Sequence, residues 1–226
     1  MISIIIPAFN EEKTIPRLIS YLKENSGEGV EIIIVDGGSA DQTISVAGKA
    51  GATVVKSPEK GRAKQMNYGA ERAKNDILYF LHADTYPPPS FYSDIEESTK
   101  KGNKAGCYRL SFDDDHPFLK FYCWFTRFDI DVFRFGDQSL FVEKDVFEKA
   151  GRFDEKLIVM EDQEIVRAIK KVSNFIIFKR SVITSARKYR KIGIVKLQLI
   201  FTSVLTMYYL GVDQQKIVDF YFRKIR

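Results

Sequence analysis

The sequence contains few of the residues that build soft-metal sites or cross-links. Its 226 residues include two cysteines, Cys107 and Cys123, and two histidines. With no CxxC spacing and so few cysteines, a zinc cage is excluded and a disulfide framework is not expected. We interpret both cysteines as packing residues, and we expect a reducing, cytoplasmic compartment.

Long apolar runs and a strong excess of one charge are also absent. The N-terminal segment MISIIIPAFNEE lacks a basic leader and its apolar run is short, so a signal peptide is not expected. No segment reaches the ~20 apolar residues of a membrane-spanning helix. The formal net charge of +5 suits an anionic ligand or a membrane surface, but it falls short of a nucleic-acid partner.

The first part of the chain alternates between predicted strands and predicted helices. Apolar runs rich in β-branched residues are typical of strands buried on both faces, whereas the segments between them have helical spacing. The predicted strands cover residues 2–6, 31–35, 52–56 and 77–81, and the predicted helices follow at 12–22, 44–50 and 61–74. This order predicts an α/β fold with a mostly parallel central sheet and helices on both faces.

The later part of the chain is more mixed. We predict strands at residues 105–112, 138–143 and 175–178, and helices at 116–133 and 160–172. No linker interrupts the pattern, so residues 1–190 are expected to form one domain. Its nucleotide-binding half would be residues 1–100 and its acceptor half 101–190, with a C-terminal helical tail over 191–226.

Polar segments follow three of the predicted strands. They read PAFNEE, DGGS and HAD, and ligands of a parallel sheet bind at these carboxyl ends. Because neither GxxxxGK[ST] nor GxGxxG is present, a diphosphate would have to be held in another way. An acidic group can face a diphosphate through a divalent cation, so we expect Asp84 to bind Mn²⁺ or Mg²⁺.

Five motifs in this order resemble those of family 2 glycosyltransferases, which have the GT-A, Rossmann-like fold. They are SIIIPAFNEEKTI, EIIIVDGGSADQT, GRAKQMNYGA, YFLHADT and VMEDQE. Each motif alone is weak, but their order at successive strand ends is specific. The resemblance covers roughly residues 1–190. It is closest to a small bacterial and archaeal branch that carries HAD where most members carry DxD.

The resemblance implies a donor pocket for a nucleotide-diphosphate sugar. Glu11 would lie near the ribose, Asp36 would accept from the base edge, and Arg62 would meet the base or the phosphates. Uridine is the expected base and guanosine is the alternative. The residues expected to line the pocket are Pro7, Ala8, Asn10, Glu11, Asp36, Arg62, Gln65 and Asn67.

The HAD segment departs from the family pattern at its first residue. His82 replaces the first aspartate of DxD, and Ala83 lies between it and Asp84. A neutral imidazole can donate to a ribose or to the water shell of a metal, but it contributes no charge to the metal. The alternative is that His82 only caps the strand.

The resemblance also implies the reaction, an inverting displacement in which a carboxylate takes the proton of the acceptor hydroxyl. Asp162 would be this base, and Glu161 would support either Asp162 or the acceptor. Taken alone, the pair could merely favour a helix N-terminus.

Two further segments are assigned by the same resemblance. Asp137 and Gln138, in RFGDQSLF, would shape the donor-sugar and acceptor pocket, although a simple turn is the alternative. Arg187, in TSARKYRKIG, would contact the diphosphate, although no matching glutamine is present and a solvated basic run is the alternative. The acidic run FDDDHP is interpreted as a turn rather than as a second metal site.

The C-terminal tail combines apolar, aromatic and basic residues. Its segment LIFTSVLTMYYLGV has about 14 apolar-leaning residues, too few to span a bilayer. Such helices could lie on an anionic membrane, cover the sheet or form a homodimer contact. The membrane alternative would place a cytoplasmic protein on the inner face of the membrane and would favour a lipid-linked acceptor.

These observations favour a metal-dependent, inverting glycosyltransferase that moves a sugar to an acceptor hydroxyl. A sugar-1-phosphate nucleotidyltransferase is the second hypothesis, but its usual basic, glycine-rich first loop is replaced here by an acidic one. A non-catalytic nucleotide-binding protein is the third, because His82 departs from the family pattern.

Overall fold

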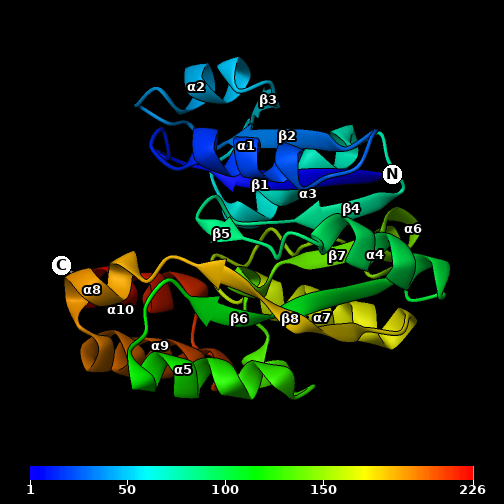
Figure 1. Cartoon of the computed structure of the whole chain (residues 1–226). Helices are drawn as coiled ribbons and strands as arrows, with labels where there is room; N and C mark the ends of the chain where they lie inside the picture. The colour runs from blue at the N-terminus through cyan, green and yellow to red at the C-terminus, as the bar shows by residue number, and fades with distance from the viewer. Residues whose placement is uncertain (226) are drawn as a thin grey trace.

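The structure is a computed structural model that describes residues 1–225. An eight-stranded sheet has the order β3-β2-β1-β4-β7-β6-β8-β5 (Figure 1). The strands are β1 Ile2–Ala8, β2 Glu31–Asp36, β3 Thr53–Lys56, β4 Ile77–Phe80, β5 Thr85–Tyr86, β6 Ala105–Phe112, β7 Leu140–Glu143 and β8 Ile176–Thr184. The helices are α1 Ile15–Glu24, α2 Thr43–Lys49, α3 Arg62–Arg72, α4 Phe91–Lys100, α5 Pro117–Trp124, α6 Lys144–Lys149, α7 Glu161–Val172, α8 Arg187–Ile192, α9 Ile194–Tyr209 and α10 Gln214–Ile225.

The first four long strands form the predicted parallel half of the sheet. β1 lies between β2 and β4, β2 pairs with β3, and all three pairings are parallel. Alternate residues of β1 point to opposite faces, so Ile4 and Ile5 belong to two separate core clusters. One cluster includes α1 and α4, and the other includes α3 and α7, which confirms helices on both faces.

The other half of the sheet is mixed. β7 is antiparallel to β4 and to β6, β8 is parallel to β6, and β5 is antiparallel to β8. The strands predicted at 105–112 and 138–143 are confirmed as β6 and β7. The strand predicted at 175–178 is longer, because β8 runs on to Thr184, where Thr184 pairs with Thr85 of β5.

The helix predicted over residues 116–133 is wrong beyond Trp124. α5 ends there, and two short 3₁₀ turns follow at Phe125–Arg127 and Asp131–Phe133. The guanidinium of Arg134 donates to the carbonyls of Thr126 and Phe128, at 2.8 and 2.6 Å, and so holds the non-helical segment that follows α5.

The three C-terminal helices gather at one end of the molecule, beside α5 and the ends of β6 and β8 (Figure 1). A small core of Leu119, Ala186, Tyr189 and Leu197 joins α5, α8 and α9. Within residues 1–225, no helix combines the length and apolarity needed to cross a bilayer. The boundary predicted at residue 190 stays a prediction.

Candidate active site

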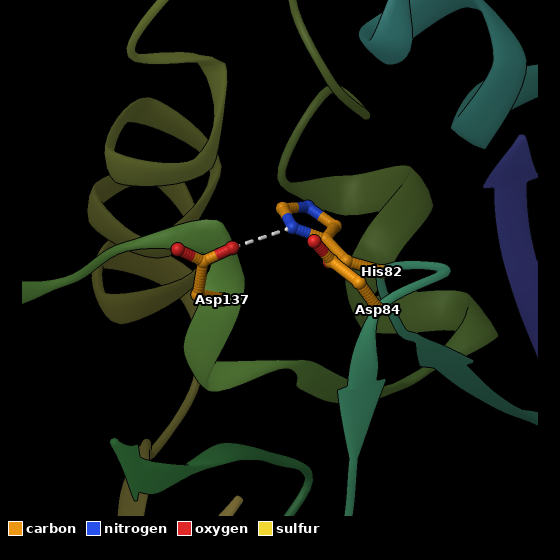
Figure 2. A group of neighbouring side chains, drawn as sticks. All are labelled: His82, Asp84 and Asp137. Atoms are coloured by element: carbon orange, nitrogen blue, oxygen red, sulfur yellow. Dashed lines mark hydrogen bonds and ion pairs between the residues drawn. The ribbon is translucent and has the colours of Figure 1, made fainter. Parts of the chain in front are cut away.

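Three polar side chains meet at the carboxyl end of β4. His82 and Asp84 follow that strand, and Asp137 approaches from the 3₁₀ turn Gly136–Gln138 (Figure 2). The His82 Nδ1 atom lies 2.9 Å from Asp137 Oδ1. One ligand atom from each of the three residues lies within 4.8 Å of the others. The fold thus brings the HAD segment and the GDQ loop together, a contact that the sequence did not predict.

Polar contacts continue from this cluster through Arg62 to Glu161. Arg62 opens α3, and its Nε donates to Glu161 Oε1 at 2.5 Å. The Arg62 Nη1 atom also lies 3.5 Å from His82 Nε2. Since arginine can only donate, this geometry leaves the proton of a neutral His82 on Nδ1, facing Asp137. The line Glu161–Arg62–His82–Asp137 thus fixes the direction of each side chain.

The pKa values of the cluster follow from this arrangement. Burial alone would lower the pKa of His82, but the hydrogen bond to Asp137 and the charges of Asp137 and Asp162 together raise it. Burial would raise the pKa of Asp137, but the bond from His82 and the positive charges of His82, Arg62 and Lys188 together lower it. The pKa of Asp84 is raised, first by burial and then by the negative charge of Asp137. The Asp84 carboxylate is therefore short of positive charge.

The donor set fits a divalent cation. Asp84 and Asp137 offer carboxylate oxygens, which Mg²⁺ and Mn²⁺ prefer, and His82 would offer a nitrogen to Mn²⁺ on giving up its contact with Asp137 or Arg62. Because His82 Nδ1 faces Asp137, the histidine can also orient that carboxylate from outside the ligand shell. The sequence predicts Asp84 as the metal ligand, which stays a prediction, and the structure adds Asp137 as a second candidate.

Asp162 lies against this cluster from the start of α7. The approach is so close that a Cβ atom on Gly136 would lie 2.2 Å from Asp162 Oδ2 and 2.7 Å from His82 Cε1. Only glycine therefore fits between the two side chains. Within the described chain, the Asp162 carboxylate makes no hydrogen bond or ion pair with another residue. It is thus available to accept a proton.

The backbone before α7 is in a strained conformation. Met160 has a φ of 70°, in the left-handed region that non-glycine residues rarely adopt. The helix begins directly after this turn, and Glu161 and Asp162, as consecutive helical residues, leave it in different directions. Such strain at the edge of a site is held only where surrounding contacts fix it.

Glu161 is fully buried, unlike its neighbour. One carboxylate oxygen binds Arg62, and the other, Oε2, has no hydrogen-bond partner within residues 1–225. Burial raises the pKa of Glu161. A direct contact with the acceptor is therefore disfavoured, and of the two expected roles the structure favours support, through Arg62.

A second group of charges lies on the nucleotide side of the rim. Arg187, the first residue of α8, binds both oxygens of Glu11, and its Nη1 is 3.1 Å from Glu11 Oε2. The same guanidinium lies 3.3 Å from Asp84 Oδ2. Asn10 takes a left-handed φ of 55° and binds the next loop through Ser39 and Ala40. Three segments therefore close on one another where the nucleotide is expected.

Several residues predicted to line the pocket use their polar groups in hydrogen bonds within the protein. Asp36 is fully buried and accepts from the backbone N–H groups of Gly38 and Ser39. Gln65 is buried and donates to the carbonyls of Ala8 and Val35, so it ties the ends of β1 and β2 together. These bonds give both side chains a part in shaping the loops.

Asn67 and Gln138 are corrected in the same way. Asn67 is buried and exchanges hydrogen bonds with the backbone of Phe153. Gln138 is buried and binds the backbone of Tyr108 and Phe135. Both amides are buried and bonded within the protein, since Asn67 also donates to the Glu155 carboxylate, so they hold the chain rather than face a substrate. Sequence alone cannot tell a buried amide from an exposed one.

The small residues at the rim contribute mainly through the backbone. Ala8 and Ala83 are buried, and Pro7 is half-buried in β1. Lys188 is not among the predicted site residues, and Gly136 is predicted only as a member of the loop that carries Asp137 and Gln138. Gly136 stands in the GDQ loop, and Lys188 stands in the basic run that contains Arg187, which are the only signals that could have found them.

The fold and this rim define the GT-A class of nucleotide-sugar-dependent transferases. Residues 3–145 match Glycosyl transferase family 2, so the chain belongs to that family, as the motifs predicted. The HAD branch within it stays a prediction.

Curated relatives match parts of the chain. An uncharacterized glycosyltransferase of Rickettsia typhi is 26% identical over 203 residues, which cover 83% of this chain and 64% of that protein. The 4,4'-diaponeurosporenoate glycosyltransferase of Staphylococcus haemolyticus is 38% identical over 90 residues, which cover 37% of this chain and 24% of that protein. The chain thus spans less than two thirds of these relatives.

Two solved structures share the fold at low identity. TarS of S. aureus in complex with UDP has a TM-score of 0.68 at 17% identity, covering 81% of this chain and 60% of that chain. The mannosyltransferase of Pyrobaculum calidifontis in complex with GDP-Man and Mn²⁺ has a TM-score of 0.66 at 16% identity, covering 99% and 73%. At this identity the likeness shows the GT-A fold alone.

Proposed function

We propose that this protein is a metal-dependent, inverting glycosyltransferase that moves a sugar from a nucleotide diphosphate to an acceptor hydroxyl. The observation that carries the proposal is the meeting of His82, Asp84 and Asp137 beside Asp162, at the carboxyl edge of a family 2 fold. The named complexes of the fold relatives, with UDP and with GDP-Man and Mn²⁺, support a nucleotide sugar as donor.

The geometry of the site suggests how its residues would bind the donor diphosphate. Asp84, Asp137 and His82 would hold Mn²⁺ or Mg²⁺, which would offset the charge that gathers on the leaving diphosphate. Arg187 would move from Glu11 and Asp84 to the diphosphate, since its guanidinium already lies at that edge.

The transfer step uses Asp162 as general base. The acceptor oxygen forms a bond to the anomeric carbon while its proton passes to the Asp162 carboxylate. The bond from that carbon to the diphosphate oxygen breaks, and the oxygen keeps the electron pair. Attack from the face opposite the leaving group, in a single displacement, inverts the anomeric centre. Asp162 takes a proton in this step and forms no bond to the sugar.

Nucleotide binding tests the donor site directly. Thermal unfolding is measured with UDP, GDP, CDP, ADP and dTDP, each with and without Mn²⁺. A ligand at about 100 times its Kd stabilises by about 2.7 kcal/mol, roughly 5–10 °C for a chain of this size. We expect a shift for a uridine or guanosine nucleotide that requires Mn²⁺ and is lost in Asp84→Asn.

The matched control is Asp115→Asn, a carboxylate whose side chain is 99% exposed, away from the site. Its nucleotide shift should equal that of the unmodified protein. No shift with any nucleotide would contradict the proposal, and release of pyrophosphate from a nucleoside triphosphate would point to a nucleotidyltransferase instead. Once a donor is identified, its slow hydrolysis is followed by proton NMR. The anomer of the sugar that is released first tests whether the reaction inverts the anomeric centre.

A further inference from the structure

A cavity of about 530 Å³ adjoins the reacting residues. At one end it is lined by His82, Asp84, Asp137 and Asp162, the four side chains of the proposed transfer step. Pro7, Asn10, Glu11 and Asp36, on the nucleotide side, do not line it among the residues that the structure describes. The cavity therefore extends from the site on the acceptor side, and its volume suits a small-molecule ligand.

The other end of the cavity has a different chemistry. Its walls come from three directions and are mostly aliphatic or aromatic. β6 contributes Leu110 and Phe112, the segment after α5 contributes Phe133 and Phe135, and the C-terminal helices contribute Leu197, Phe201, Val204, Leu205, Val218 and Phe222. Phe222 is 55% exposed, so this end opens to the surface beside α10.

The apolar wall is a built feature rather than a loose gap. Arg134, which also lines the cavity, is almost fully buried and holds the carbonyls of Thr126 and Phe128. Tyr189 donates its hydroxyl to Gln198 at 3.1 Å, which joins α8 to α9 along the same wall. The helices that the sequence left with three alternatives thus enclose this space.

These walls select against a purely polar acceptor. A hydroxyl that loses water and finds no partner weakens binding by about five- to a hundredfold, whereas each methylene that is buried strengthens it by about fourfold. A molecule with one reactive hydroxyl and a long apolar body matches both ends of the cavity.

We propose that the acceptor carries its hydroxyl on an elongated alkyl or isoprenoid body. This body lies between β6, α9 and α10, with the hydroxyl at Asp162. The inference rests on the proposed function and deepens it, because it names the class of acceptor. The apolar chain can leave the cavity at Phe222 when it is longer than the space inside.

A chain-length series on the unmodified protein tests the proposal without a substitution. Binding of 1-hexanol, 1-octanol, 1-decanol and 1-dodecanol is measured by calorimetry in the presence of the nucleotide and Mn²⁺. Affinity should rise about fourfold per added methylene until the cavity is filled. Affinity that is independent of chain length overturns the proposal.

Substitutions then locate the binding. Leu205→Trp on α9 fills the cavity and should weaken 1-decanol binding at least tenfold. Thr202→Trp, on the same wall but exposed, is the second variant if Leu205→Trp does not fold. The control is Leu199→Trp. Leu199 is 64% exposed on α9 and does not line the cavity, so the affinity of this variant should stay within twofold of that of the unmodified protein. Equal affinity in all variants overturns the proposal.

Two arms separate this inference from the proposed function. A protein that shows the nucleotide and Mn²⁺ shift but no chain-length dependence keeps the transferase and loses the apolar acceptor. Alcohol binding without any nucleotide shift overturns the acceptor role. Dodecanol is then supplied either free in solution or within neutral phosphatidylcholine vesicles. The comparison shows whether the acceptor enters from water or from a lipid surface. Binding from either source supports the proposal.

Discussion

The two sides of the rim are built in different ways. On the nucleotide side, the loops at the ends of β1 and β2 are held by hydrogen bonds to one another, as when Asn10 binds Ser39 and Ala40. On the acceptor side, the cavity is enclosed by side chains from β6, the segment after α5, α9 and α10. The nucleotide side is therefore polar and determined by neighbouring strands, whereas the acceptor side is apolar and assembled from distant segments.

This difference suggests which side can vary between related proteins. A nucleotide presents the same ribose and phosphates whatever sugar it carries, so loops fixed by the sheet suit it. Acceptors differ far more, and helices packed at the edge of the sheet can change without disturbing the strands. His82, Gly136 and Asp162 lie where the two sides meet.

The largest expected effect comes from Asp162→Asn. The amide keeps the shape of the side chain but cannot take the acceptor proton, so kcat should fall about 10²–10⁴-fold. The Mn²⁺-dependent nucleotide shift should be retained, because Asp162 lies on the acceptor side. Transfer rates with the donor found by thermal shift check the first point. A rate within tenfold of the unmodified enzyme would exclude Asp162 as the base.

A smaller effect is expected from Gly136→Ala, which disturbs the junction of the two sides. The added Cβ would lie 2.2 Å from Asp162 Oδ2, so the loop or the carboxylate must shift. We expect about 1–3 kcal/mol of lost stability, as for overpacking, together with a lower kcat. Urea unfolding and initial rates measure the two effects.

Gly48→Ala is the matched control for this change. A Cβ at Gly48, in α2, has no neighbour within 4 Å. Alanine is also the better helix former, so this variant should be unchanged or slightly more stable, by up to about 1 kcal/mol. Equal stability of the two variants would mean that the close approach at Gly136 carries no constraint.

The sequence predicted what local patterns control. The β-branched runs of β1 and β2 indicated buried parallel strands, and the polar segments after them indicated the rim. The C-terminal tail was left open between a membrane, the sheet and a dimer, because the partners of its apolar side chains lie far away in the chain.

Long-range contacts explain the remaining differences. The segment after α5 is held by Arg134, which is buried and binds the carbonyls of Thr126 and Phe128, and no helical pattern reports these bonds. The pairing of Arg62 with Glu161 joins residues 99 positions apart, so the buried role of Glu161 requires the folded chain. β5 has only two residues, too few for a strand pattern, and it forms because β8 lies beside it.

The smallest expected effect concerns the contact between the sheet and the C-terminal helices. Asp113, directly after β6, accepts from the backbone of Ala186 at 2.6 Å and from Arg190 at 3.0 Å. Burial is the largest single influence and opposes ionisation of Asp113, but the bonds from Arg190 and Ala186 and the charge of Arg190 together lower its pKa. Because the pair is nearly half-exposed, Asp113→Asn should cost only a few tenths to about 1 kcal/mol at pH 7.

The pH dependence gives this prediction its sign. A carboxyl whose pKa is lower in the folded state stabilises above its ordinary pKa, and it loses that contribution as the pH falls through the lowered value. The stability difference between the unmodified protein and Asp113→Asn should therefore be present at neutral pH and shrink below about pH 4. Urea unfolding from pH 7 to pH 3 measures it. A difference that grows on acidification would mean that Asp113 does not join α8 to the sheet through its charge, and the C-terminal wall of the cavity would then be held by packing alone.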